Sequence, residues 1–193
     1  KYASTKVVDE LLLTNPDMFP ARKCHKKIKF TEIPQFSENS LLNAGSVFNV
    51  GTDLFPVVEK GIYYFNQPFD EKLDKIEFKF LKELGKIYPN KTIYIKLHPL
   101  TTDSKKKKYS SIKKVNLIDT KIPAELFILN LKNSILFTGW STVLITNNPS
   151  CNLYFNLPIY KNQGSKAVDQ SDLILLPHIK LIVNPGEMKF PQE

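Results

Sequence analysis

The sequence has almost no arginine and very little cysteine. All but one of its 27 basic residues are lysine, the exception being Arg22, so it lacks the arginine arrays and Gly-rich aromatic segments typical of single-strand nucleic-acid binders. Cys24 and Cys151 lie far apart without metal-ligand spacing, which argues against a disulfide framework or a zinc site. No apolar run approaches the roughly 18 residues of a membrane span, and no segment has the layout of a signal peptide. We therefore expect a cytoplasmic protein with reduced thiols.

The basic residues outnumber the 19 acidic ones and leave a formal charge of +8. They are spread along the chain except for one dense run, 104–114, which contains four consecutive lysines at 105–108. We expect this run to be a solvated loop. The alternative is an electrostatic contact with an anionic lipid head group or a phosphorylated glycolipid. At 193 residues the chain can form one well-packed domain, or one domain with an appendage.

Strand-like and helix-like segments alternate from Gly61 onward. The strand-like segments are rich in β-branched and aromatic residues, whereas the helix-like ones repeat apolar residues at helical spacing. Segment 70–89 shows the helical pattern most clearly, with acidic residues in its first turn and Pro89 at its end. We expect strands within 61–69, 91–99, 115–119, 134–140 and 151–160 and helices within 70–89, 122–133 and 141–149, while 171–183 fits either state.

This alternation predicts right-handed crossovers and a mostly parallel, Rossmann-like α/β sheet with helices on both faces. We assign that domain to residues 61–193. Residues 1–60 do not follow the same rhythm, because a segment that fits a helix (4–14) and one that fits a strand (26–34) are followed by a polar connection. We expect 1–60 to be an irregular linker or the remnant of a preceding domain.

Polar residues follow three of the expected strands at the point where each ends. These are Asn66–Phe69, His98 with Pro99, and Gly139–Thr142. In an open parallel sheet the carboxyl ends of the strands meet at one edge, where ligands bind. The sequence therefore predicts one binding edge that carries all three groups.

His98 is the first candidate for chemistry at this edge. It has the side chain whose ordinary pKa lies near neutrality, and beside a phosphate it could donate a hydrogen bond or a proton to a leaving group. Pro99 restricts His98 to extended backbone and so presets the direction of the ring. His25 and His178 have no such setting, and we interpret them as structural.

The other candidates each allow two interpretations. Ser141 or Thr142 could simply cap the helix that follows, or could bind an anion together with the free N–H groups of its first turn, with Gly139 providing the tight turn. Glu125, which follows Pro123, could interact only with the helix dipole, or could accept hydrogen bonds from ribose hydroxyls.

Three segments in this order, YIKLHP (94–99), IPAE (122–125) and FTGWST (137–142), resemble the carboxyl-terminal half of bacterial sialyltransferases. HKKIKFTEIPQF (25–36) and YYFNQPF (63–69) look most like glycosyltransferase family 52, the lipooligosaccharide sialyltransferases. The resemblance covers roughly residues 25–160. It implies the carboxyl-terminal, donor-binding domain of a GT-B architecture.

The implied reaction is inverting transfer of sialic acid from CMP-sialic acid to a terminal galactose-type acceptor, with no cofactor and no obligatory metal. By resemblance, His98 contacts the donor phosphate and assists CMP departure, with Pro99 as its motif partner. The remaining implied substrate contacts are Ser141 and Thr142 at the phosphate, Glu125 at the nucleotide, and Gln67 and Gly139 at the same edge.

Two features depart from the family pattern. The general base of the family is an acid in an Asp/Glu-Asp-Gly motif, and this sequence contains neither DDG nor EDG. We expect that motif to precede Lys1, so that this chain is the donor-binding half, which binds CMP but catalyses little by itself. The strand end also carries Asn66 where the family has glycine.

The partners expected are the nucleotide-sugar donor and a lipooligosaccharide or other glycan acceptor, without nucleic acid. A homodimer and peripheral contact with the inner face of the bacterial inner membrane are left open. Two alternatives stay open as well. One is another GT-B transferase with an HP-type histidine, either a capsule polysialyltransferase or a CDP-glycerol glycerophosphotransferase, and the other is a non-catalytic module that binds an anionic ligand.

Overall fold

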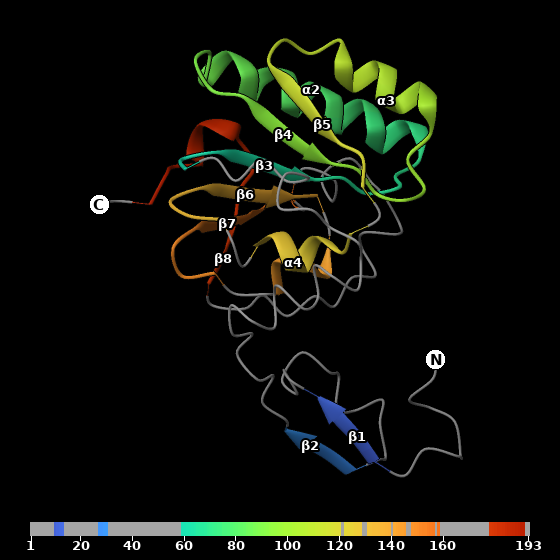
Figure 1. Ribbon diagram of the computed structural model, residues 1–193, viewed down its shortest axis with the longest axis vertical. Helices are drawn as coiled ribbons and strands as arrows, with labels where there is room; N and C mark the ends of the chain where they lie inside the picture. Colours follow the sequence, from blue (N-terminus) through green and yellow to red (C-terminus); the bar gives the residue numbers. More distant parts are fainter. Residues whose placement is uncertain are drawn as a thin grey trace.

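The computed structural model contains a six-stranded sheet in which every strand pair is parallel (Figure 1). The structure describes residues 10–13, 27–30, 59–120, 122–128, 131–139, 141–145, 148–156, 158 and 178–191. The strands of the sheet are β3 (Ile62–Phe65), β4 (Ile93–Lys96), β5 (Val115–Ile118), β6 (Ile135–Thr138), β7 (Asn152–Phe155) and β8 (Ile179–Leu181). The predicted parallel α/β fold is confirmed, and the ambiguous segment 171–183 contributes a strand.

The strand order β5-β4-β3-β6-β7-β8 determines where a ligand can bind. The chain moves outward from β3 through β4 to β5, and then returns to place β6 on the other side of β3. This is the doubly wound order, in which the crossovers on the two sides of the switch point leave a crevice at the carboxyl ends of the strands. The switch point here lies between β3 and β6.

The helix α2 (Glu71–Ile87) begins and ends as its sequence predicts. The Asp70 side chain caps it by accepting a hydrogen bond from the Leu73 amide at 2.9 Å. Acidic residues occupy its first turn and a lysine its last, which suits the helix dipole. Its stripe of buried leucine and phenylalanine packs on the sheet, where each buried side chain contributes about 1.5–3 kcal/mol.

The lysine run is not the solvated loop that we expected, because most of it forms the helix α3 (Asp103–Ser110). Thr102 caps this helix by accepting a hydrogen bond from the Lys105 amide at 3.3 Å. Lys105 and Tyr109, four residues apart and hence on one helix face, are buried. The side chain of Lys105 is therefore part of the protein interior.

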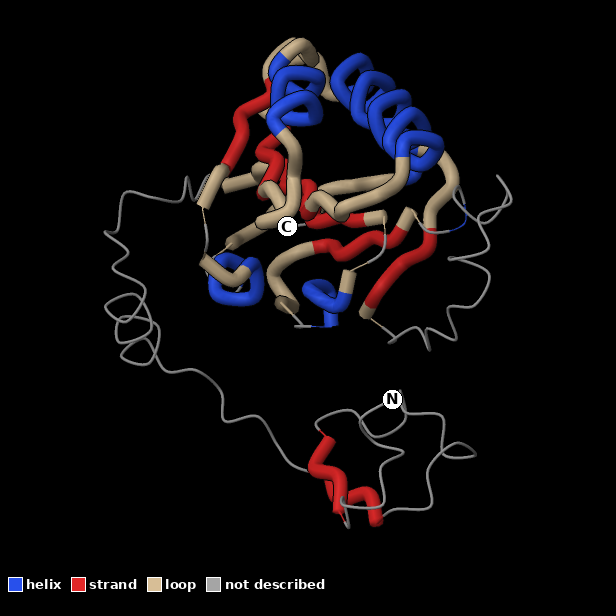
Figure 2. Tube along the Cα trace, turned by 90° about the vertical axis from the view of Figure 1, so that its right-hand side faces the viewer, coloured by secondary structure: helices blue, strands red, loops and turns tan. Residues whose placement is uncertain are grey.

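Helices lie on both sides of the sheet (Figure 2). Side chains of alternating direction along the strands divide the core into two layers. One layer, with Ile62 and Tyr64 of β3, packs under α2 and α3. The other, with Tyr63 and Phe65, packs against α4 (Ala124–Ile128) and the 3-10 turn η4 (Thr142–Ile145). A second 3-10 turn, η5, spans Pro185–Glu187. Helices therefore cover both faces of the sheet, as predicted.

In the first sixty residues the structure describes a separate parallel pair, β1 (Glu10–Leu13) with β2 (Lys27–Phe30). The expected strand within 26–34 is confirmed, whereas the helix expected within 4–14 is wrong for residues 10–13. Their run of three leucines is too short to show helical periodicity. The rest of the proposed linker, apart from residues 59 and 60, lies outside the described residues. Among the described helices, none is long and apolar enough to cross a membrane.

Candidate functional site

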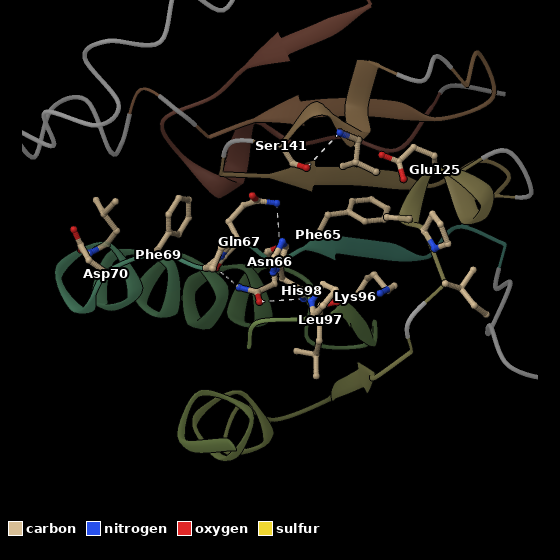
Figure 3. A pocket seen from close by; sticks show the side chains of 17 residues that line it. Phe65, Asn66, Gln67, Phe69, Asp70, Lys96, Leu97, His98, Glu125 and Ser141 are labelled. Atoms are coloured by element: carbon tan, nitrogen blue, oxygen red, sulfur yellow. Dashed lines mark hydrogen bonds between the residues drawn. The ribbon is translucent and has the colours of Figure 1, made fainter. Parts of the chain in front are cut away.

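A pocket of about 830 Å³ lies at the carboxyl edge of the sheet, beside the switch point (Figure 3). It is formed by the segments that follow β3 and β4, by the first turn of α4, and by the turn that leads into η4. Five of the residues predicted from sequence line it together: Gln67, His98, Pro99, Glu125 and Ser141. The predicted convergence of three strand ends is therefore present.

Two predicted residues are not among those that line the pocket. Gly139 directly follows β6 and is buried. Thr142 begins η4, and its side chain lies outside the described part of the structure. At this third strand end, Ser141 is thus the described hydroxyl that faces the pocket.

His98 begins a tight turn whose geometry orients its ring. The Thr101 amide donates to the His98 carbonyl at 2.9 Å, which closes a four-residue turn with Pro99 in its second position. Within the turn, the Leu100 amide donates to Nδ1 of His98 at 3.1 Å. Because Nδ1 accepts this bond, the neutral ring carries its proton on Nε2 and can donate it to a ligand.

The pocket keeps His98 uncharged at neutral pH. Partial burial lowers the pKa of His98 below its ordinary value, and the ammonium groups of Lys96 and Lys105 lower it further. The ring is therefore a neutral hydrogen-bond donor in the unliganded protein. An anionic ligand beside it would favour the imidazolium and allow it to act as an acid.

Lys96, which was not among the residues predicted for the site, lines the pocket as well and brings a cationic group to it. It ends β4 and is buried, and its ammonium donates to the carbonyls of Leu97 at 3.0 Å and Thr120 at 2.7 Å. Burial lowers the pKa of Lys96, while Asp119 and Glu125 oppose that shift. A lysine in an apolar strand, two residues before His98 and so on the same side, was the signal available in the sequence.

Ser141 has the capping role that we considered for it. Its hydroxyl oxygen accepts a hydrogen bond from the Val143 amide at 3.3 Å. This bond lies in the first turn of η4. Within the described part of 141–149, the expected helix is a 3-10 turn of four residues, so a helix dipole contributes little here. The hydroxyl hydrogen of Ser141 is the group that could reach a phosphate oxygen.

The two carboxylates among the described pocket residues differ in their surroundings. Asp70 caps α2, as described above. Glu125 is exposed in the first turn of α4, and it faces the pocket across from His98 (Figure 3). Of these two carboxylates, Glu125 is the one without a helix-capping bond and is suited to accept hydrogen bonds from hydroxyl groups.

Asn66, which begins one of the three predicted strand ends and stands where the family has glycine, also lines the pocket. It is 3% exposed and directed toward α2 and α3, where it contacts the buried carboxylate of Glu77. Glu77 lies four residues after Leu73 and three before Phe80, on the buried stripe of α2. Its position on that stripe was a readable signal that the helix buries a charge.

Fold and pocket together define a doubly wound α/β domain with a ligand-sized site at its topological switch point. Residues 14–153, more than half of the 193, match the family model of the alpha-2,8-polysialyltransferases (POLYST), and the chain belongs to this family. It is a sialyltransferase family, so the resemblance to sialyltransferases is confirmed and the class of activity is glycosyl transfer. The match includes all seven predicted site residues. No individual curated protein matches the chain.

Proposed function

We propose that this chain is the donor-binding half of a sialyltransferase that uses CMP-sialic acid. The observation that carries the proposal is one pocket, at the switch point of a chain of this family, that brings Gln67, His98 and Ser141 together. A neutral Nε2–H of His98 and the hydroxyl of Ser141 are both suited to a phosphate. Glu125 is suited to ribose hydroxyls.

In this mechanism the donor phosphate binds between His98 and Ser141, with Thr142 as a further hydroxyl and Pro99 holding the turn. Once the phosphate raises the pKa of His98, the ring can protonate the departing CMP as the bond from phosphate oxygen to sialic acid breaks. The reaction needs no metal or cofactor in this proposal. Among the described residues, no group of three His, Cys, Asp or Glu side chains could hold a metal ion.

The general base that activates the acceptor hydroxyl is assigned to a segment outside this chain. Of the two pocket carboxylates described above, one caps α2 and the other is assigned to ribose. The 193-residue chain alone should bind CMP and transfer little sialic acid.

The family favours a terminal sialic acid as the acceptor, with an α2,8 linkage as its description states. The second candidate is transfer to a galactose-type acceptor of lipooligosaccharide, which rests on the likeness of HKKIKFTEIPQF and YYFNQPF to glycosyltransferase family 52. Supplying the missing half together with sialyl- or galactose-terminated oligosaccharides would distinguish the two. We further propose that the enzyme works in the bacterial cytoplasm, at the inner face of the inner membrane.

Isothermal titration of CMP tests the donor site. Wild type should bind CMP, and His98→Ala should bind about tenfold more weakly because a hydrogen bond to a charged group is lost. His178→Ala is the matched control, since its ring lies outside the pocket and contacts the Leu144 carbonyl at 3.2 Å. Equal binding by wild type and His98→Ala, or none by either, contradicts the assignment.

Competition among CMP, CDP-glycerol and UDP separates the remaining alternatives. A preference for CMP supports the sialyl donor, whereas a preference for CDP-glycerol would favour a glycerophosphotransferase. Binding to random DNA with a steep salt dependence would favour the non-catalytic module.

A further inference from the structure

A buried polar cluster lies behind the pocket, between the end of β3 and the helices α2 and α3. Its members are Asn66, Glu77, Lys105, Tyr64 and Tyr109, and we call it the Asn66 cluster. Tyr64 and Asn66 extend from the same face of β3 toward α2 and α3, opposite to the face that carries α4. Of these five residues, only Asn66 is among those that line the pocket.

Glu77 is the charged centre of the cluster. It is 1% exposed, and its carboxylate receives hydrogen bonds from the hydroxyls of Tyr64 and Tyr109 and from Nδ2 of Asn66 at 3.1 Å. The ammonium of Lys105 completes the set at 2.9 Å from Oε2. Burial still raises the pKa of Glu77 although these partners oppose the shift. A buried carboxylate with four donors holds each of them firmly.

This carboxylate fixes the orientation of the Asn66 amide. Nδ2 donates toward Glu77 and to the Tyr109 hydroxyl at 2.8 Å. If the amide were turned over, its oxygen would face a carboxylate oxygen, which is repulsive. Oδ1 of Asn66 must therefore point the other way, toward the segment after β4.

Oδ1 of Asn66 contacts both ends of the turn that carries His98. It accepts a hydrogen bond from the Thr101 hydroxyl at 2.6 Å and a longer one from the His98 amide at 3.4 Å. The bond from the Leu100 amide to the His98 ring lies inside this turn. A chain of contacts thus runs from Glu77 through Asn66 to the imidazole.

We propose that Asn66 is a positioning residue, which holds the His98 turn so that the ring presents Nε2–H to the ligand. Lys105 supports it from α3 by its ion pair with Glu77 and by a hydrogen bond to the Gln67 carbonyl at 2.9 Å. The inference rests on the proposed role of His98 toward the donor. It concerns orientation only, since Asn66 acts through His98 and not on the reacting atoms.

The test uses Thr101, because Thr101→Val removes the hydroxyl that Asn66 accepts while keeping the shape of the side chain. Thr101→Ser keeps the hydroxyl and is the matched control. Nitrogen-15 NMR of the histidine ring reports which nitrogen of His98 is protonated, and this signal does not require CMP. Lys96 and Lys105, whose charges lower the pKa of His98, are unchanged in both variants.

In Thr101→Val we expect a mixture of ring tautomers and CMP binding weakened about threefold to tenfold. Thr101→Ser should keep the wild-type ring signal. Asn66→Ala should act in the same direction and more strongly, and circular dichroism would show whether it folds. If Thr101→Val leaves both the ring signal and CMP affinity unchanged, the proposal is overturned, whatever Asn66→Ala does.

The same measurements distinguish this inference from the proposed function. If wild type does not bind CMP but Thr101→Val still shifts the ring tautomer, Asn66 positions His98 and the donor assignment is wrong. If wild type binds CMP and neither Thr101→Val nor Asn66→Ala changes the tautomer of the His98 ring, the donor site stands and the positioning role fails.

Discussion

The two faces of the sheet at the end of β3 differ in how their polar groups are held. On the α4 face, His98 is half-buried and Glu125 is exposed, and both are open to a ligand in the pocket. On the α2 and α3 face, Asn66 and Glu77 are at most 3% exposed and bonded from several directions. The groups that we propose to meet a ligand are accessible, whereas those behind them are fixed by burial and pairing. Variants on the two faces should therefore affect different measurements.

Removal of the Lys105 charge should have the largest effect on stability. Lys105→Met leaves Glu77 as a buried carboxylate without its cation, and loss of one partner of a buried pair costs about 3–5 kcal/mol of unfolding free energy. Urea denaturation measures this change. The neighbouring Lys106 pairs with Asp119 at the surface, so Lys106→Met should leave the denaturation midpoint unchanged. Equal midpoints for the two variants would show that the buried pair of Lys105 with Glu77 does not stabilise the fold.

A smaller loss is expected from Tyr109→Phe, which removes one donor to Glu77 and one acceptor for Asn66. A hydrogen bond to a charged group contributes about 1.5–3 kcal/mol to stability. Tyr94→Phe is the control from the other face. It keeps the ring that stacks on Tyr63, where the two ring centroids are 5.1 Å apart. Thermal unfolding should rank Tyr109→Phe well below Tyr94→Phe. The reverse ranking would show that the Asn66 cluster does not stabilise the fold.

The pocket face should show the opposite behaviour, with binding altered and stability retained. His98→Asn is expected to weaken CMP binding about tenfold, because the substitution removes the imidazole and with it the Nε2–H donor. Its unfolding free energy should change by no more than about 0.5 kcal/mol, as for other accessible positions. Calorimetric titration and urea denaturation on the same sample test both parts. A stability loss as large as that of Lys105→Met would remove the distinction.

The smallest expected effect is a pH dependence that originates at His98. The fold lowers the pKa of His98, so between the folded and unfolded values the unfolded chain binds more protons. Stability should therefore fall slightly as the pH drops below about 6.5, and His98→Asn should lack this increment. NMR titration of the His98 ring should give a midpoint below that of free histidine. Addition of CMP should raise this midpoint. A midpoint at or above the free value contradicts the environment described here.

The strands and the binding edge could be predicted from sequence because their signals are local. Runs of β-branched and aromatic residues mark β3, β4 and β6, and the parallel topology then places their ends together. Lys105 could not be predicted in this way. Four consecutive lysines show no amphipathic pattern, and what buries one of them is the packing of α3 beside a carboxylate 28 positions earlier in the sequence. The identity of the donor depends on the family and not on any spacing of residues.

The alternation of side chains at the end of β3 limits how this segment can evolve. Phe65 packs with the α4 layer, whereas Tyr64 and Asn66 on either side of it face α2 and α3. One residue inserted or deleted within β3 would exchange these faces for every later position of the strand. The Asn66 amide would then point away from Glu77, and the apolar ring of Phe65 would meet the buried carboxylate instead. Substitutions in this strand end can be tolerated one at a time, but its length cannot change.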